Sequence, residues 1–448
     1  MVYDMKKLFL SVLLAALMTD LCAQTPFTIS RRQASDDLDT LCAKIKEIHP
    51  DPFTVCTEEA LRRSLRDEQA ALPDSLPVRD LFLRASRLAA MIGDGHTGVR
   101  FPASDGSAPL IPLAVRIGDD TLMYARADFS QGANPVPSGA RIERINGTGT
   151  KKLLAEMMRY VSGERPFYRL TQIGDRFGEY LSLLYSGGEY EIEYRDGQHK
   201  RSVKMVPIPA SRYFKALRAF EAQQGDATPS EPYTFRVVSG NVGLIAYNAC
   251  TDFDRFRRFL DSAFTVVRDR QIDRLIVDAR RNEGGNSELN DELFQYISPV
   301  PFSQCGAMLF RISAPVRQRF GGLPDMEDGI RRTEDELTPL RENPLRFRGK
   351  TFLLVSHRTF SSAGLLSNTY KQFRMGTVVG QESGGMNLHF GELIPVTLPH
   401  SGLQAYTSCK MFYPYGPFDG KVHGTLPDYE VPAGEALDYT LKHLVGKP

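Results

Sequence analysis

The 448-residue sequence has almost no excess of either charge and few long apolar runs. Its 55 basic and 54 acidic residues leave a net charge of +1. Such a balance supplies no extended basic surface, which argues against binding to nucleic acid or to an anionic membrane. Beyond the N-terminus, no segment has the length and apolar character of a membrane span. We therefore expect a globular protein with no nucleic-acid partner and no stable membrane insertion.

Cysteine is scarce, and its spacing matches no zinc-binding pattern. The sequence contains only Cys22, Cys42, Cys56, Cys250, Cys305 and Cys409. If Cys22 is removed with a leader, five remain, so at least one thiol is free or pairs between chains. We expect most of the five to be small buried residues.

The N-terminus has the features of a secretory signal peptide. Two lysines precede the apolar run LFLSVLLAALM, and Ala23 ends the segment at a plausible cleavage site. The run is too short for a good membrane span. Cys22 would permit a lipoprotein, but the preceding TDL is a poor lipidation signal, so we expect Cys22 to leave with residues 1–23. The sequence therefore predicts export to the periplasm or the extracellular space.

Hydrophobic periodicity separates the first half of the chain into two regions. Residues 32–95 show apolar side chains at spacings of three and four, which predicts helices. Residues 108–207 show short alternating segments with turn signals between them, which predicts strands. Only one helix, KKLLAEMMRYV, is evident there. This second region is expected to be a small β-rich domain with one or two helices.

The second half alternates apolar strands with helices. The predicted strands are 242–247, 274–279, 351–356 and 376–380. This alternation indicates a largely parallel sheet that is buried on both faces. Active sites in such sheets gather in the loops after the carboxyl ends of the strands. Two loops qualify, RRNEGGN after the second strand and HRTFSSAG after the third.

Two adjacent serines, Ser361 and Ser362, open the helix after the third strand. Serines at a helix start are commonly caps. The same position offers free backbone N–H groups and the positive end of the helix dipole, which favour an oxyanion. No GxSxG segment surrounds them, which argues against the α/β-hydrolase fold. Gly284 and Gly285 in RRNEGGN can bring further N–H groups close to a ligand.

His96 lies between glycines in GDGHTG, and we expect it to be exposed. The ordinary pKa of histidine suits a general base near neutral pH. Asp94 and Glu392 are the candidates for an acid that orients its imidazole, and sequence spacing does not choose between them. His357 and His389 lie near the serine loop in sequence.

Five segments occur in a fixed order, and together they resemble peptidase family S41. They are DGHT, LIVDARRNEGG, LLVSHRTFSSAG, TVVGQESGG and GTLPDYEVP. The family includes the C-terminal processing proteases and the tricorn-like proteases. The segment PSGARIERINGTGTKKLLAEM resembles the family's PDZ-like domain, in which a strand and a helix hold a peptide end.

The resemblance implies a multi-domain α/β fold with a ClpP/crotonase-like core. Before it come an N-terminal helical region and a small β-rich PDZ-like domain. The expected divisions are a signal peptide at 1–23, a helical region carrying His96 at 24–100, a PDZ-like domain at 101–210 and an S41-type catalytic α/β core at 211–448.

The resemblance also carries over catalytic roles. Ser361 matches the nucleophile, and His96 matches the general base of the tricorn-like branch. The oxyanion donors are the N–H groups of Ser362 and of Gly285, or else Gly284. A serine endopeptidase of this kind acts on a peptide or protein substrate through an acyl-enzyme and needs no metal and no organic cofactor. The resemblance gives no oligomeric state.

Three positions depart from the family pattern. Met386 stands where the processing proteases have a lysine base, and Gly364 stands where they commonly have glutamate. Gly95 replaces the serine that precedes the histidine in the tricorn-like branch. A Ser–Lys pair is therefore not expected. Two alternatives stay open: a weak or inactive homologue that binds peptides, and a serine hydrolase of esters or other acyl groups.

Overall fold

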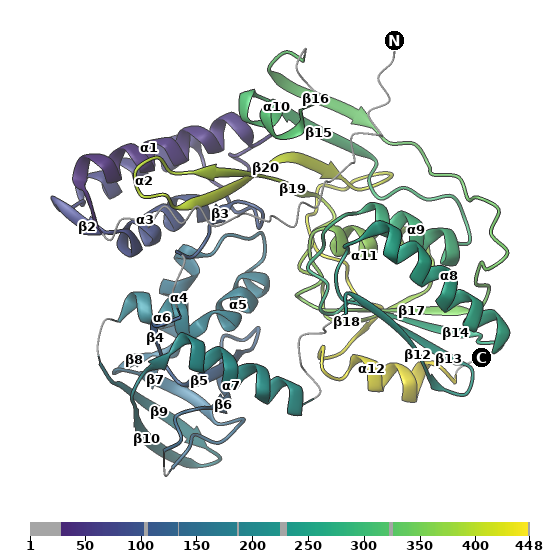
Figure 1. Ribbon diagram of the computed structural model, residues 1–448, viewed down its shortest axis with the longest axis horizontal. Helices are drawn as coiled ribbons and strands as arrows, with labels where there is room; N and C mark the ends of the chain where they lie inside the picture. Colours follow the sequence, from purple (N-terminus) through teal and green to yellow (C-terminus); the bar gives the residue numbers. More distant parts are fainter. Residues whose placement is uncertain are drawn as a thin grey trace.

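The computed structural model describes residues 28–102, 106–132, 134–185, 188–224, 231–321 and 326–446. The predicted signal peptide and Cys22 lie outside these residues. The chain forms three lobes that meet near the centre of the molecule (Figure 1). Among the described helices, none combines the length and the apolar character needed to cross a membrane.

The α/β lobe is built on a six-stranded sheet in the order β12, β13, β14, β17, β18 and β21. Neighbours from β13 to β21 are parallel, and β12 joins the edge antiparallel to β13. The strands are β12 (Tyr233–Ser239), β13 (Val242–Tyr247), β14 (Arg274–Asp278), β17 (Lys350–Val355), β18 (Thr377–Gly380) and β21 (Tyr429–Glu430). The predicted strands and their largely parallel arrangement are confirmed.

Helices cover both faces of this sheet. Leu275 and Val277 of β14 face a core shared with three helices, and Ile276 between them faces the opposite side. The helices are α8 (Phe253–Asp269), α9 (Glu288–Ile297) and α11 (Ser362–Gln372) on the first face, and α12 (Ala436–Tyr439) with the π-helical turn Thr440–Leu444 on the second. Burial on both faces is why the strands are apolar throughout rather than alternating.

The N-terminal helices form a second lobe together with strands from the other end of the chain. Their apolar faces share one core with a sheet in the order β16, β15, β20 and β19, in which β3 also pairs with β20. The elements are β1 (Thr28–Ser30), α1 (Arg31–Ile48), α2 (Glu58–Ala70), β2 (Ser75–Pro77), α3 (Val78–Ala90), β3 (Gly98–Val99), β15 (Ala307–Ile312), α10 (Ala314–Phe320), β16 (Gly329–Glu334), β19 (His389–Thr397) and β20 (Gln404–Tyr413). The loop that carries His96 is thereby fixed to β20.

The third lobe is β-rich, as predicted, but its described residues contain more helix than expected. Its main sheet runs β10, β9, β7, β6 and β5, with β8 paired to β7. The elements are β4 (Pro109–Leu110), β5 (Leu113–Ile117), β6 (Met123–Asp128), β7 (Arg141–Ile145), β8 (Thr148–Gly149), α4 (Thr150–Met157), the 3-10 turn Met158–Tyr160, α5 (Pro166–Asp175), α6 (Phe177–Leu184), β9 (Tyr190–Asp196), β10 (His199–Met205), β11 (Ile208–Pro209) and α7 (Ala210–Gln223). The expectation of one or two helices was wrong because α5 and α6 were missed.

All five described cysteines are unpaired. Four of them are buried, and Cys56 is partly exposed. The expectation of a free thiol and of mostly buried cysteines is confirmed.

Candidate active site

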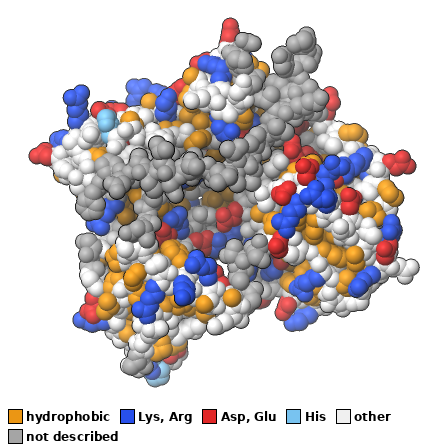
Figure 2. All heavy atoms as spheres, viewed as in Figure 1, with side chains coloured by type: hydrophobic (Ala, Val, Ile, Leu, Met, Phe, Trp, Pro, Cys, Tyr) orange, Lys and Arg blue, Asp and Glu red, His pale blue; other side chains and the backbone are white. Residues whose placement is uncertain are grey.

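A cavity of about 850 Å³ lies where the three lobes meet. Figure 2 shows the hollow from one side, with acidic side chains in its wall. Each lobe contributes to the lining: His96 from the helical lobe, Tyr168 from α5 of the β-rich lobe, and Ser361 from the α/β lobe. Ser361 and His96, which are 265 residues apart in the sequence, therefore line one cavity.

Ser361 stands at the N-cap position of α11, and its backbone is strained. It has φ of 54° and ψ of −126°, in a region that non-glycine residues rarely adopt. Such a conformation costs on the order of 1–3 kcal/mol and is found mostly at functional sites. The hydroxyl makes no capping hydrogen bond. Helix capping, the simplest explanation of this serine, therefore does not account for it.

The adjacent hydroxyl has a different role. The Oγ of Ser362 donates to the backbone carbonyl of Gly285 at 2.6 Å. The carbonyl of Ser362 in turn accepts from Asn290 Nδ2 at 2.8 Å. These two bonds fix the start of α11 to the glycine loop and to α9. Ser362 thus holds these segments together, and its hydroxyl is engaged in a hydrogen bond and not free to react.

The glycine loop lies directly against the serine turn. A Cβ on Gly284 would lie 2.7 Å from the Cβ of Ser361, so only glycine allows this approach. The N–H of Gly284 is already bonded to Asn282 Oδ1 at 2.8 Å. Within the described part of the chain, no acceptor takes the N–H of Gly285 or that of Ser362. Of the two glycines considered from the sequence, Gly285 is therefore the one with a donor to offer.

His96 is buried, with only 6% of its surface exposed, so the expectation of an exposed side chain was wrong. Its ring stacks on Phe360 with centroids 4.5 Å apart, and Tyr168 stacks on the other face of Phe360 at 4.4 Å. A Cβ on Gly95 would lie 2.8 Å from the Phe360 ring. The flanking glycine thus admits an aromatic ring rather than solvent. Both imidazole nitrogens of His96 are buried and have no hydrogen-bond partner among the described residues.

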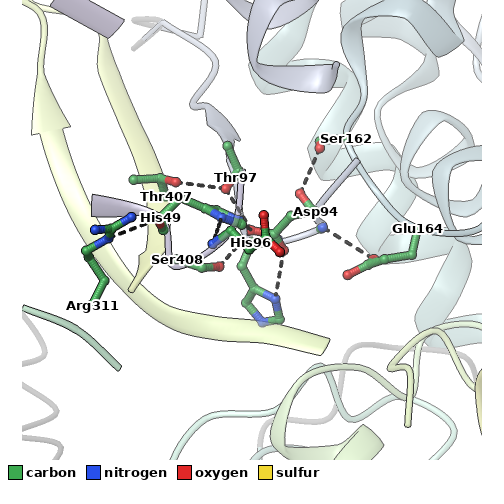
Figure 3. A network of polar contacts seen from close by, with 11 residues as sticks. His49, Asp94, His96, Thr97, Ser162, Glu164, Arg311, Thr407 and Ser408 are labelled. Atoms are coloured by element: carbon green, nitrogen blue, oxygen red, sulfur yellow. Dashed lines mark hydrogen bonds and ion pairs between the residues drawn. The ribbon is translucent and has the colours of Figure 1, made fainter. Parts of the chain in front are cut away.

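Asp94 lies next to this imidazole, with Oδ1 at 3.7 Å from His96 Nδ1 (Figure 3). The carboxylate is fully buried. It accepts hydrogen bonds from the backbone N–H of His96 at 2.8 Å, and from the hydroxyls of Thr97 and Ser408 at 2.7 Å each. His49 Nε2 lies 3.3 Å from Oδ2.

The charge on Asp94 is well stabilised. Burial opposes ionisation, but the hydrogen bond from His49 and the nearby His96 imidazole outweigh it and hold the pKa of Asp94 well below its usual range. An ionised carboxylate beside Nδ1 is what an imidazole needs in order to accept a proton on its other nitrogen.

Glu392, the other acid considered from the sequence, also lines the cavity but has a different partner. It lies in β19 with a φ of 59°, between Gly391 and Leu393, which pair with β20 in one continuous register. Its Oε2 accepts from the buried Lys410 at 3.1 Å. No contact found among the described residues joins Glu392 to His96. The structure therefore brings Asp94, and not Glu392, to the imidazole.

Sequence reasoning missed the contribution of α5. Tyr168 supports the ring of Phe360, and Asp175 at the end of the helix pairs with Arg358 in the serine loop. Proline at the first helical position and apolar residues at helical spacing, including Leu170 and Ile173, were the available signals. The helix binds the β-rich lobe to the loop that carries Ser361.

His389 also lines the cavity, and it is buried. Its ring stacks on Phe412 at 5.1 Å. Burial, with the nearby charge of His96, lowers the pKa of His389 to about 3. The imidazole is therefore neutral at physiological pH and adds no charge to the site.

Glu164, which was not singled out from the sequence, holds the other side of the His96 loop. Its Oε2 accepts the N–H of Gly95 at 3.3 Å, while Oε1 is buried with no partner among the described residues (Figure 3). Burial and the charge of Asp94 raise the pKa of Glu164 from 4.5 to about 8. The carboxyl group therefore holds a proton at neutral pH.

We expect Glu164→Gln to stabilise the protein in a pH-dependent way. Between pH 4.5 and pH 8 the folded state keeps a proton that the unfolded chain releases, so the stability of the wild type falls as pH rises through this window. The neutral amide removes this dependence. Thermal unfolding from pH 5 to pH 8 should show the variant gaining relative to wild type as pH rises. A difference that is constant with pH would contradict the assignment.

The chain resembles known proteins both in sequence and in fold. Residues 241–431, from β13 to β21, match the model of peptidase family S41. This segment belongs to peptidase family S41. Two structures of mature CPAF share the fold. The complex with lactacystin is 14% identical with a TM-score of 0.63, covering 91% of this chain and 95% of that chain. The crystal structure of mature CPAF is 13% identical with a TM-score of 0.61, covering 91% and 94%.

Membership makes the chain a serine-type peptidase, with a peptide or protein as substrate. In this S41 peptidase two positions that depart from the pattern of the processing proteases, Met386 and Gly364, are tightly packed. Met386 is fully buried, and its backbone forms an isolated bridge with Gly424. A Cβ on Gly364 would lie 2.7 Å from the Cα of Gly385, which excludes a glutamate. The mixed α/β fold expected from the sequence is confirmed.

Proposed function

We propose that this S41 peptidase is an exported endopeptidase with Ser361 as nucleophile, His96 as general base and Asp94 as the orienting acid. The observation that carries the proposal is the shared cavity. It brings a strained serine, whose hydroxyl makes no capping bond, together with a buried histidine beside an ionised carboxylate. Export rests on the signal-like residues 1–23.

The proposed reaction begins when His96 Nε2 takes the proton of Ser361 Oγ and the oxygen attacks the peptide carbonyl. The carbonyl oxygen becomes an oxyanion, which the free N–H groups of Gly285 and Ser362 stabilise. The imidazolium, facing Asp94, gives its proton to the leaving amine, and the C–N bond breaks. A water molecule, deprotonated by the same imidazole, then cleaves the acyl-enzyme ester and restores Ser361.

We assign substrate holding to the β-rich lobe, as a PDZ-like domain. Support comes from α5 of this lobe, which forms part of the cavity wall and touches the serine loop through Tyr168 and through Asp175, the partner of Arg358. A peptide bound to this lobe would thus lie next to the reacting groups.

The test is labelling with a fluorophosphonate, which reacts only with an activated serine. We expect one phosphonylated residue, and peptide mapping by mass spectrometry should locate it at Ser361. Labelling should disappear in His96→Ala while the circular dichroism spectrum is unchanged. An unlabelled, well-folded wild type that binds peptides would instead favour an inactive homologue. A labelled protein that cleaves an ester panel but no peptide library would favour an esterase.

A further inference from the structure

His49, at the end of α1, is a buried imidazole for which the proposed reaction has no role. Its side chain has no exposed surface, and its ring packs against that of Phe390 in a tilted arrangement, with centroids 4.4 Å and planes 50° apart. The backbone N–H of Asp51 donates to Nδ1 at 3.2 Å. Because Nδ1 accepts, the neutral ring carries its proton on Nε2 and donates it to Asp94 Oδ2 at 3.3 Å. The HPDP turn after α1 thus fixes both the orientation and the tautomer of His49.

The other donors to Oδ2 are less strictly directed. They are the hydroxyls of Thr97 and Ser408, which rotate about their C–O bonds. Thr97 has an alternative partner, since its oxygen lies 2.9 Å from that of Thr407. The imidazole of His49 has no such freedom, because the Asp51 N–H holds it on one side and the tilted ring of Phe390 packs against it.

The contacts of Asp94 divide between its two oxygens (Figure 3). Oδ2 is bound by His49 and the two hydroxyls, while Oδ1 faces the backbone N–H and the Nδ1 of His96. A carboxylate held in this way turns one oxygen toward His96. If Oδ2 lost its rigid donor, only the two rotatable hydroxyls would hold that oxygen, and the carboxylate would be less firmly directed toward the imidazole.

We propose that His49 is a positioning residue that holds the Asp94 carboxylate toward His96. The proposal rests on the proposed function, because it concerns the acid of that catalytic group. His49 itself touches no substrate and does not line the cavity. Besides Asp94, the charged group that faces it from another element is Arg311 of β15, whose Nε donates to the His49 carbonyl at 3.4 Å.

Two amide substitutions separate the contacts of His49. The amide nitrogen of His49→Gln falls close to the position of Nε2, so it can still donate to Asp94. The amide of His49→Asn can accept from the Asp51 N–H but is too short to reach Asp94. A third variant, Phe390→Leu, removes the aromatic contact with the His49 ring and leaves both hydrogen bonds of the imidazole.

The experiment measures the rate constant of fluorophosphonate labelling as a function of pH, with the melting temperature of each variant. We expect His49→Asn to label roughly 10- to 100-fold more slowly, as misplaced catalytic groups do. The acid limb, meaning the low-pH side of its pH–rate profile, should lie at lower pH because the imidazolium loses its counter-charge. His49→Gln should recover most of the wild-type labelling rate, and its acid limb should lie at the wild-type pH. Phe390→Leu should lower the melting temperature without moving the limb.

The outcomes that overturn the proposal are distinct from those that overturn the function. Equal rates in the Gln and Asn variants, or a limb that moves equally in all three variants, would mean that His49 only packs the core. If the Asn variant is too unstable to measure, a Gln variant slower than Phe390→Leu at equal melting temperature also overturns it. A folded wild type without labelling overturns the proposed function and this inference together.

Discussion

Replacing Ser361 by alanine is expected to lower kcat by on the order of 10⁴- to 10⁶-fold, whereas Ser362→Ala should lower it by about tenfold or less. The first change removes the attacking oxygen. The second keeps the backbone N–H that stabilises the oxyanion and loses only the hydroxyl bond to Gly285. The pair should be compared on a peptide library at neutral pH, with single-turnover kinetics for the slow variant.

The stabilities of the two variants should differ in the opposite sense to their activities, with Ser362→Ala the less stable of the two. Ser361→Ala removes no capping hydrogen bond, so its melting temperature should match the wild type. Ser362→Ala breaks a 2.6 Å bond in a partly buried joint and should cost about 1 kcal/mol. Similar losses of activity in the two variants, or a large loss of stability in the first, would contradict the division of roles between the two serines.

The parallel sheet was predictable from the sequence because it depends on local pattern. Strands buried on both faces must be apolar at every position, and Leu275, Ile276 and Val277 show this over consecutive residues. The positions of the two site loops follow from the same rule, since parallel strands bring their carboxyl ends to one edge. The serine loop and the glycine loop accordingly lie in contact through Gly284.

The surroundings of His96 could not be predicted, because they come from distant parts of the chain. Glycines on both sides of a histidine usually indicate exposure. Here the space left by Gly95 is filled by Phe360, which stands more than 260 residues later in the sequence. Asp94 is held beside His96 in part by Ser408, whose hydroxyl reaches it from β20. No spacing rule along the chain contains such contacts.

The mixed origin of the helical lobe has the same cause. Apolar periodicity shows that α1 and α3 bury one face, but it does not show what covers that face. The covering sheet comes from β15, which lies between β14 and β17 in the sequence, and from β19 and β20, which lie between β18 and β21. The change of sequence pattern at residue 100 therefore does not mark the edge of this lobe, because its hydrophobic core also includes residues from later in the chain.

Asp94→Asn is expected to lower kcat by on the order of 10²- to 10⁴-fold. The substitution keeps the shape of the side chain but removes the negative charge beside His96 Nδ1. It also places an amide N–H among groups that are all donors, including the hydroxyls of Thr97 and Ser408. The imidazolium formed during the reaction would then lack its counter-charge and its orientation.

Asp94→Asn should also change how the free energy of unfolding depends on pH. The pKa of Asp94 lies well below its ordinary value of 3.8, so its charge stabilises the fold above that pH. This contribution is lost as the pH falls through the lowered pKa. The variant should therefore be less stable than wild type at pH 7, by about 1–3 kcal/mol for donors left without an acceptor, and the difference should narrow below pH 4.

Glu392→Gln is the matched control, because Glu392 lines the same cavity but pairs with Lys410. It should lose less than about tenfold in kcat, since no transition-state charge depends on it. Urea unfolding at pH 7 and pH 3, together with kcat on the same peptide library, measures both variants. A larger loss of kcat in Glu392→Gln than in Asp94→Asn would assign the orienting role to Glu392 and would require the site to rearrange when substrate binds.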